Sequence, residues 1–209
     1  MSLSRKAFLG VGATALGLGA FGGVVKAFGG KRDLLRPPVV RDEVDFISKC
    51  VRCYRCVSVC HTGALVPATV NDGLLEVKTP KFDFKRGSCD FCNKCVEVCP
   101  THAIEICDPL NPAAGRIGVA VVISDRCIAY FDGCVECKDR CPYEAISVDE
   151  SGRPLVNEAL CNGCGVCENV CPALVYRSFS GGNQRGIAVV KDASFSPSPT
   201  TGEGATDHA

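Results

Sequence analysis

Apolar residues occur in short runs along this chain, and three of these runs repeat one pattern. Segments 61–66, 100–106 and 142–148 each begin with a turn, continue with Ala and a branched residue, and extend for a few positions more. Runs this short suit strands of a few residues better than long helices. The pattern therefore predicts an internal repeat in which each turn leads into a short strand.

Turn residues between neighbouring runs predict two β-hairpins. An Asn-Asp-Gly turn ending at Gly73 separates 68–70 from 74–77, and a polar turn separates 146–148 from 154–156. Such turns between apolar runs are typical of antiparallel pairs. We expect both pairs to form.

Three further elements follow from the hydrophobic pattern. Residues 117–123 form the strongest strand candidate, and 186–190 suit a last edge strand. Residues 42–49 predict a short helix with Phe46 and Ile47 facing inward.

Composition indicates a thin hydrophobic core and no charge bias. Aromatic residues make up 7% of the 209 residues and Trp is absent, while 23 basic residues balance 23 acidic ones. A balanced charge gives no basic field for nucleic acid. With so few large side chains, bound metal groups are expected to replace much of the core and to be required for folding.

Cysteine is the most informative residue, because sixteen of the seventeen cysteines form four sets of four. The fourth set has the spacing C-x2-C-x2-C-x3-C-P, and the second repeats it. The first set has His61 in the proline position, and the third has six residues in its first gap instead of two. The sets are Cys50, Cys53, Cys56 and Cys60; Cys89, Cys92, Cys95 and Cys99; Cys127, Cys134, Cys137 and Cys141; and Cys161, Cys164, Cys167 and Cys171.

This spacing predicts four [4Fe–4S] clusters with these sixteen cysteines as cofactor and metal ligands. Three closely spaced thiolates hold one cluster, and the fourth Cys ligates the neighbouring cluster in two-cluster ferredoxins. A disulfide scaffold and structural zinc are the alternatives. Disulfide frameworks rarely repeat one tight motif, and zinc sites use two close pairs separated by a longer loop. The left-over Cys107 is expected to be a free thiol.

Sets three and four are offset by 30 residues at three matched cysteines, which predicts that adjacent sets share clusters. The same offset argument pairs sets one and two. A nested pairing, set one with four and two with three, stays open at this point, because chain-crossing rules do not exclude it. The tandem pairing assigns the clusters to Cys50, Cys53, Cys56 and Cys99; Cys89, Cys92, Cys95 and Cys60; Cys127, Cys134, Cys137 and Cys171; and Cys161, Cys164, Cys167 and Cys141.

The amino terminus has the form of a twin-arginine export signal, with Arg5 followed by Lys6 in the second arginine position. Residues 7–25 carry no charge but hold six glycines, which suits a signal segment better than a stable membrane helix. An uncleaved membrane anchor is the alternative.

These features divide the chain into five parts. We expect a signal or anchor at 1–30, a linker at 31–45, one ferredoxin-like module at 46–125, a second at 126–190, and a disordered tail at 191–209, which is rich in Ser, Pro, Thr and Gly. The expected fold class is α+β, with tandem two-cluster bacterial ferredoxin-like modules, short β-hairpins, short helices and little other regular structure.

The flanking segments resemble those of the MauM/NapG ferredoxin-type proteins. The likeness covers roughly residues 34–190. It rests on Arg-Pro-Pro at 36–38, Arg-Ile-Gly-Val-Ala-Val-Val at 116–122, the Cys-x2-Cys-Gly-x-Cys-Glu motif at 161–168, and Arg-Gly-Ile-Ala-Val-Val at 185–190. Lys6 and His61 depart from the family pattern.

The resemblance implies an exported carrier of four [4Fe–4S] clusters. It implies a periplasmic location, or one at the outer face of the cytoplasmic membrane. The expected partners are a quinol-oxidising membrane protein and an exported reductase or dehydrogenase. No motif for bond-making catalysis is present, so we expect an electron-transfer component and no catalytic residues. The alternatives are an obligate iron–sulfur subunit of a molybdenum-dependent oxidoreductase and a cytoplasmic polyferredoxin.

Overall fold

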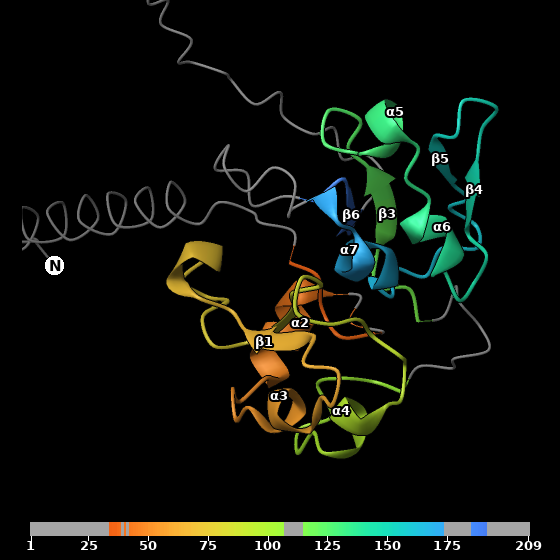
Figure 1. The fold of residues 1–209 in the computed structure, drawn as a ribbon. Helices are drawn as coiled ribbons and strands as arrows, with labels where there is room; N and C mark the ends of the chain where they lie inside the picture. Colours follow the sequence, from red (N-terminus) through yellow and green to blue (C-terminus); the bar gives the residue numbers. More distant parts are fainter. Residues whose placement is uncertain (1–33, 39, 41, 107–114, 174–184, 192–209) are drawn as a thin grey trace, which may run out of the picture.

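The computed structural model of the chain describes residues 34–38, 40, 42–106, 115–173 and 185–191. Short helices alternate there with strands of three or four residues, an α+β architecture as expected (Figure 1). The helical elements are α2 (Glu43–Lys49), α3 (Arg55–Val59), η1 (Val70–Asp72), α4 (Lys94–Glu97), α5 (Ala129–Asp132), α6 (Glu136–Asp139) and α7 (Val166–Val170). The strands are β1 (Leu65–Pro67), β2 (Pro80–Phe82), β3 (Val119–Val122), β4 (Ile146–Val148), β5 (Pro154–Val156) and β6 (Ile187–Val190).

Helix α2 confirms the helix predicted at 42–49. Asp42 is its N-cap, and the Asp42 carboxylate accepts hydrogen bonds from the backbone N–H groups of Val44 and Asp45. Such a cap satisfies N–H groups that have no partner within the helix. Phe46 is 2% exposed and anchors the helix to the core.

Each sheet described is a two-stranded antiparallel pair. β4 pairs with β5, which confirms the predicted hairpin at 146–156. β3 pairs with β6, so both predicted strands form. This pairing joins the strand before the third cysteine set to the last described strand.

 The register partners Val122 and Ile187 have 64 residues between them along the chain, so no local turn joins the two strands.

The hairpin predicted around Gly73 is wrong. β1 pairs instead with β2, and the 3-10 turn η1 lies between them. The Asp72 carboxylate accepts a hydrogen bond from the Thr69 backbone N–H and binds the Lys81 ammonium at 2.6 Å. The chain therefore does turn near Gly73, but the residues predicted as strands on either side, 68–70 and 74–77, form no strand. The strand expected after the second cysteine set is also wrong, since residues 103–106 form no strand.

Three groups of buried side chains make up the described core. One group lies around β3, β4 and β6, and another lies beneath α2 around Phe46, Val96 and Ile104. The third group joins the two halves of the molecule, because Phe84 from one half packs with Cys164 from the other. Figure 1 shows α2, α3 and α4 in one half and α5, α6 and α7 in the other.

Several sequence predictions fall outside the described residues. These concern the export signal or anchor at 1–30, the free thiol of Cys107 and the tail at 191–209, of which only Lys191 is described. Within the described part of the chain, no helix is both long enough and apolar enough to cross a membrane.

Candidate functional site

The structure gathers the sixteen predicted cysteines into four groups, and each group takes three cysteines from one set and the last cysteine of the adjacent set. Each group is called a site and is numbered after the set that contributes three cysteines. Site 1 is Cys50, Cys53, Cys56 and Cys99; site 2 is Cys89, Cys92, Cys95 and Cys60; site 3 is Cys127, Cys134, Cys137 and Cys171; and site 4 is Cys161, Cys164, Cys167 and Cys141.

Sites 1 and 2 each line a cavity of their own. The four cysteines of site 1 line one cavity, and those of site 2 line another. Burial, together with the nearby Cys50 and Cys95 thiols, raises the pKa of Cys56 to about 12. The two sites therefore adjoin each other through Cys56 and Cys95.

The cysteines of sites 3 and 4 are grouped by the effect of each thiol on the pKa of its neighbours. Burial raises the pKa of Cys137 to about 11, with added contributions from Cys127, Cys134 and Cys171. These are the other three cysteines of site 3. Clustered thiols of this kind resist ionisation until a cation compensates the negative charge, which is what a metal group provides.

Cys167 has the same relation to site 4. Burial raises the pKa of the Cys167 thiol well above its usual range, and Cys164, Cys161, Cys137 and Cys141 also raise it. Three of these four belong to site 4, and Cys137 belongs to site 3. The last cysteine of set three thus lies with set four, as the tandem pairing requires.

A repeated backbone shape forms the cysteine loops. In sets one, two and four, the residues two and four positions after the first Cys have positive φ. The pairs are Arg52 and Tyr54, Phe91 and Asn93, and Gly163 and Gly165. A left-handed residue turns the backbone sharply, and successive N–H groups in such turns line concave anion sites. The loops therefore fit an anionic, sulfur-ligated group.

Backbone N–H groups also point at sulfur atoms. The Ala145 N–H donates to Cys141 Sγ, and the Ala120 N–H donates to Cys161 Sγ, each at 3.4 Å. Burial would raise the pKa of Cys99, but the backbone N–H groups of Thr101, Ile104 and Ala103 outweigh it and leave the pKa lowered. Four convergent sulfurs with N–H donors are the surroundings expected for an iron–sulfur cluster. The residues present fit that group.

The glycines of set four allow close packing, against the segment before β3 at Gly163 and against the half that contains sets one and two at Gly165. A Cβ added at Gly163 would lie 2.5 Å from the Gly118 backbone, and one at Gly165 would lie 2.1 Å from the Phe84 ring. The Cys89 N–H donates to the Cys164 carbonyl at 2.8 Å across the same interface. Set four is therefore buried against the half that contains sets one and two.

These contacts place the sites in the order 1, 2, 4, 3. Cys56 and Cys95 bring sites 1 and 2 together, and the Cys89 to Cys164 hydrogen bond joins sites 2 and 4. Cys137 lies close enough to Cys167 to raise the pKa of the Cys167 thiol, which joins sites 4 and 3. The order along this row differs from the order along the sequence.

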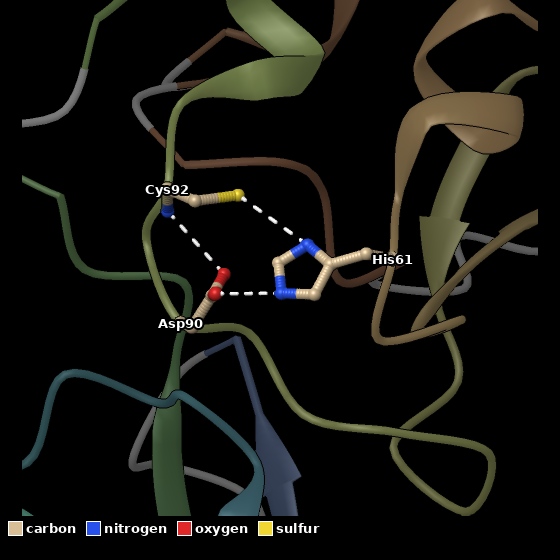
Figure 2. A group of neighbouring side chains, drawn as sticks. All are labelled: His61, Asp90 and Cys92. Atoms are coloured by element: carbon tan, nitrogen blue, oxygen red, sulfur yellow. Dashed lines mark hydrogen bonds and ion pairs between the residues drawn. The ribbon is translucent and has the colours of Figure 1, made fainter.

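One group beside site 2 was not predicted from the sequence. Figure 2 shows the His61 ring facing both Asp90 and Cys92. His61 Nε2 lies 2.9 Å from Asp90 Oδ2, and His61 Nδ1 lies 3.9 Å from Cys92 Sγ. All three side chains are exposed, and their ligand atoms are mutually close enough for a metal ion. His61 in the proline position of set one was the one available signal, whereas Asp90 gave none.

Comparison with known families identifies the cofactor class. Residues 49–104 and 88–145 each match a 4Fe-4S dicluster domain, and residues 153–176 match a 4Fe-4S binding domain. The first two matches overlap at set two, so they do not decide by themselves which sets share a cluster. They support [4Fe–4S] clusters over the disulfide and zinc alternatives.

Comparison with individual proteins shows which family of [4Fe–4S] proteins the chain belongs to. The ferredoxin-type protein NapF of Escherichia coli is 32% identical over 143 residues, which cover 66% of this chain and 80% of NapF. The ferredoxin-type protein NapG of the same organism is 35% identical over 154 residues, covering 66% of this chain and 65% of NapG. The methylamine utilization ferredoxin-type protein MauM of Methylorubrum extorquens is 32% identical over 189 residues, covering 81% and 85%. The chain therefore belongs to the MauM/NapG family of ferredoxin-type proteins and is an electron-transfer protein of the [4Fe–4S] class.

Proposed function

We propose that this protein holds four [4Fe–4S] clusters and relays electrons along the row of sites 1, 2, 4 and 3. The observation that supports it is the convergence of sixteen cysteines into four groups of four sulfurs. Clusters bound there would supply reversible one-electron chemistry. The chain's own contribution is to hold the sulfurs, bury them and direct N–H donors toward them, which tunes the reduction potential of each cluster.

Contacts between neighbouring sites support a continuous path. The Cys89 N–H and the Cys164 carbonyl form a direct bridge between the two halves, so no solvent layer separates sites 2 and 4 at this point. Asn169 adds a second bridge, because its side-chain amide donates to the Phe84 carbonyl at 3.0 Å. We further propose two modules, at 46–125 and 126–190, that work as one unit across this interface.

The partners and the location are also proposals. Family membership supports two redox partners. One is a quinol-oxidising membrane protein, and the other is an exported reductase or dehydrogenase. It also supports a location in the periplasm or at the outer face of the cytoplasmic membrane. Residues 1–30 are proposed to direct export or to anchor the chain.

A permanent subunit of a molybdenum-dependent oxidoreductase is the second candidate. Exposed apolar side chains favour it, since Leu74 and Leu75 are 61% and 65% exposed. A permanent subunit covers such residues within its complex. Purified protein that elutes as a stable monomer and accepts electrons from small reductants would favour the free carrier.

Metal analysis tests the proposed ligands directly. Anaerobically purified protein should contain about sixteen iron and about sixteen acid-labile sulfide per chain. Cys164→Ser should lose about a quarter of the iron and one reduced-cluster signal in electron paramagnetic resonance, because one of four sites is disrupted. Cys107→Ser, which changes the cysteine outside the four sets, should leave both unchanged.

Full occupancy of all four clusters with unaltered spectra in Cys164→Ser would contradict the assignment. An iron content of about eight per chain in the unmodified protein would contradict the number of clusters.

A further inference from the structure

The cysteine loop of set one is exposed where the matching loop of set four is buried. Residues 51–55 are all exposed, whereas 161–165 are all buried. Both loops have the same left-handed positions, at Arg52 and Tyr54 in set one and at two glycines in set four. The same backbone conformation therefore lies in the interior at set four and on the molecular surface at set one.

Side chains at these left-handed positions are costly. A residue with a Cβ in this conformation loses about 1–2 kcal/mol relative to glycine. Set four has glycine at both positions, but set one has Arg52 and Tyr54. Backbone strain of this kind is retained mainly where the side chain serves a function. Neither of these two side chains is buried, so packing of the core does not account for them.

A second loop extends the same surface. Arg52 Nε donates to the Val77 carbonyl at 3.0 Å, and an Arg52 terminal nitrogen donates to the Leu75 carbonyl at 2.9 Å. The exposed side chains of Leu74 and Leu75 therefore adjoin the loop that contains Cys53, the most exposed cysteine of site 1. Together these residues form the set-one face, defined as Val51, Arg52, Tyr54, Arg55, Leu74 and Leu75.

Uncompensated positive charge surrounds this apolar surface. Arg52 binds only backbone carbonyls, and among the described residues neither Arg55 nor Lys78 takes part in an ion pair. Arg52, Arg55 and Lys78 all line the site 1 cavity, and Glu97 is the acidic residue in the adjoining hollow beside Cys53. The second loop also contains Glu76, between Leu75 and Val77, so the three basic residues Arg52, Arg55 and Lys78 outnumber the acidic Glu76 and Glu97 and leave this face locally basic.

We propose that the set-one face docks a one-electron redox protein whose contact surface is apolar at its centre and ringed by carboxylates. Basic residues attract such a partner and orient it, and the apolar side chains are buried on contact. One electron leaves one protein and the other gains it, with site 1 as the end of the row that exchanges electrons with this partner. The inference rests on the proposed function, because it takes site 1 to hold a cluster.

Electron transfer from a reduced acidic flavodoxin, used as the probe, tests the charged part of the face. The holoprotein is mixed with the probe anaerobically, and the rate of cluster bleaching is followed by stopped flow. Arg55→Glu should lower the second-order rate constant about tenfold at low ionic strength, and added salt should remove most of the difference. Lys138→Glu makes the same charge change on α6 beside site 3 and should alter the rate less than twofold.

Leu75→Ala tests the apolar part separately. It should slow reduction about threefold at both low and high salt, because loss of apolar contact is not screened by ions. Reduction by dithionite, a small anion, measures cluster content and should reach the same extent in every variant. Failure of that control would count against the proposed function, whereas an intact control isolates the docking face.

Three results would overturn the docking proposal. Equal slowing by Arg55→Glu and Lys138→Glu would show a general charge effect. Unchanged rates in both Arg55→Glu and Leu75→Ala would show that electrons reach the row elsewhere. A faster rate in Leu75→Ala would show that a segment of the chain itself, such as residues 1–33, covers this face.

Discussion

Replacing Gly165 by Ala should weaken the contact between the two halves of the molecule. Gly165 has a φ of +79°, and an added Cβ would lie 2.1 Å from the Phe84 ring. The left-handed backbone costs about 1–2 kcal/mol for a residue with a Cβ. Overpacking against a buried ring adds about 1–3 kcal/mol. The total destabilisation expected is about 2–5 kcal/mol.

Gly133→Ala is the matched control. Gly133 also lies next to a motif cysteine and has a φ of +61°, but an added Cβ would meet no atom within 4 Å. Only the backbone cost of about 1–2 kcal/mol applies there. The difference between the two variants, about 1–3 kcal/mol, therefore measures the packing of set four against Phe84.

Unfolding rates provide the assay, because release of clusters makes equilibrium unfolding irreversible. Holoprotein is unfolded anaerobically in guanidinium, and loss of visible absorption and of circular dichroism is recorded. At about 1.4 kcal/mol per tenfold, Gly165→Ala should unfold about 5–150 times faster than Gly133→Ala where the contact is lost in the transition state. Phe84→Leu should relieve part of the clash, so the double variant should be more stable than additivity predicts. Equal unfolding rates for the two glycine variants would refute the tight interface.

Two further predictions concern the half that contains sites 1 and 2. Arg36→Ala should destabilise the protein by about 3 kcal/mol, because the buried Arg36 binds Glu43, the Thr79 hydroxyl and the Pro80 carbonyl. Lys49→Ala, which removes one partner of the exposed ion pair with Asp45, should have a much smaller effect in the same unfolding assay. A similar loss in both would contradict the role of Arg36. Burial would raise the pKa of Asp72, but hydrogen bonds from Lys81 and Thr69 outweigh it and leave that pKa lowered. The stability from Asp72 is therefore present above the unfolded pKa and is lost as the pH falls through the folded pKa, so Asp72→Asn should unfold faster at neutral pH and depend less on pH in the acid range. An unchanged acid dependence in Asp72→Asn would assign that dependence to other groups.

Local spacing was enough to predict the cysteine sets and several elements. Three thiols separated by two residues each can bind one cluster whatever the fold of the remaining chain, so the motif can be recognised from the sequence alone. Helix α2 and the β4–β5 hairpin were also predicted correctly, because the Asp42 cap and the turn at 150–153 act within a few residues.

Contacts between residues far apart in the sequence could not be predicted from local spacing. The hairpin predicted around Gly73 does not form, and β1 pairs with β2 instead. Asp72 accepts a hydrogen bond from the Thr69 N–H and binds the Lys81 ammonium, which stabilises the connection between β1 and β2. The pairing of β3 with β6 and the position of Asp90 beside His61 also depend on segments far apart in sequence. Spacing carries no information about such partners.

The sequence by itself determined the four cysteine sets, because three thiols of each set lie within a few residues of one another, but it left open which set supplies the fourth thiol. Only the tertiary structure decided the order of the sites and their exposure. Set four is central and buried because its glycines let Phe84 and the Gly118 backbone approach, whereas set one, with Arg52 and Tyr54 in the same backbone shape, lies at the surface. Packing between the two halves, which local propensity does not specify, made that distinction.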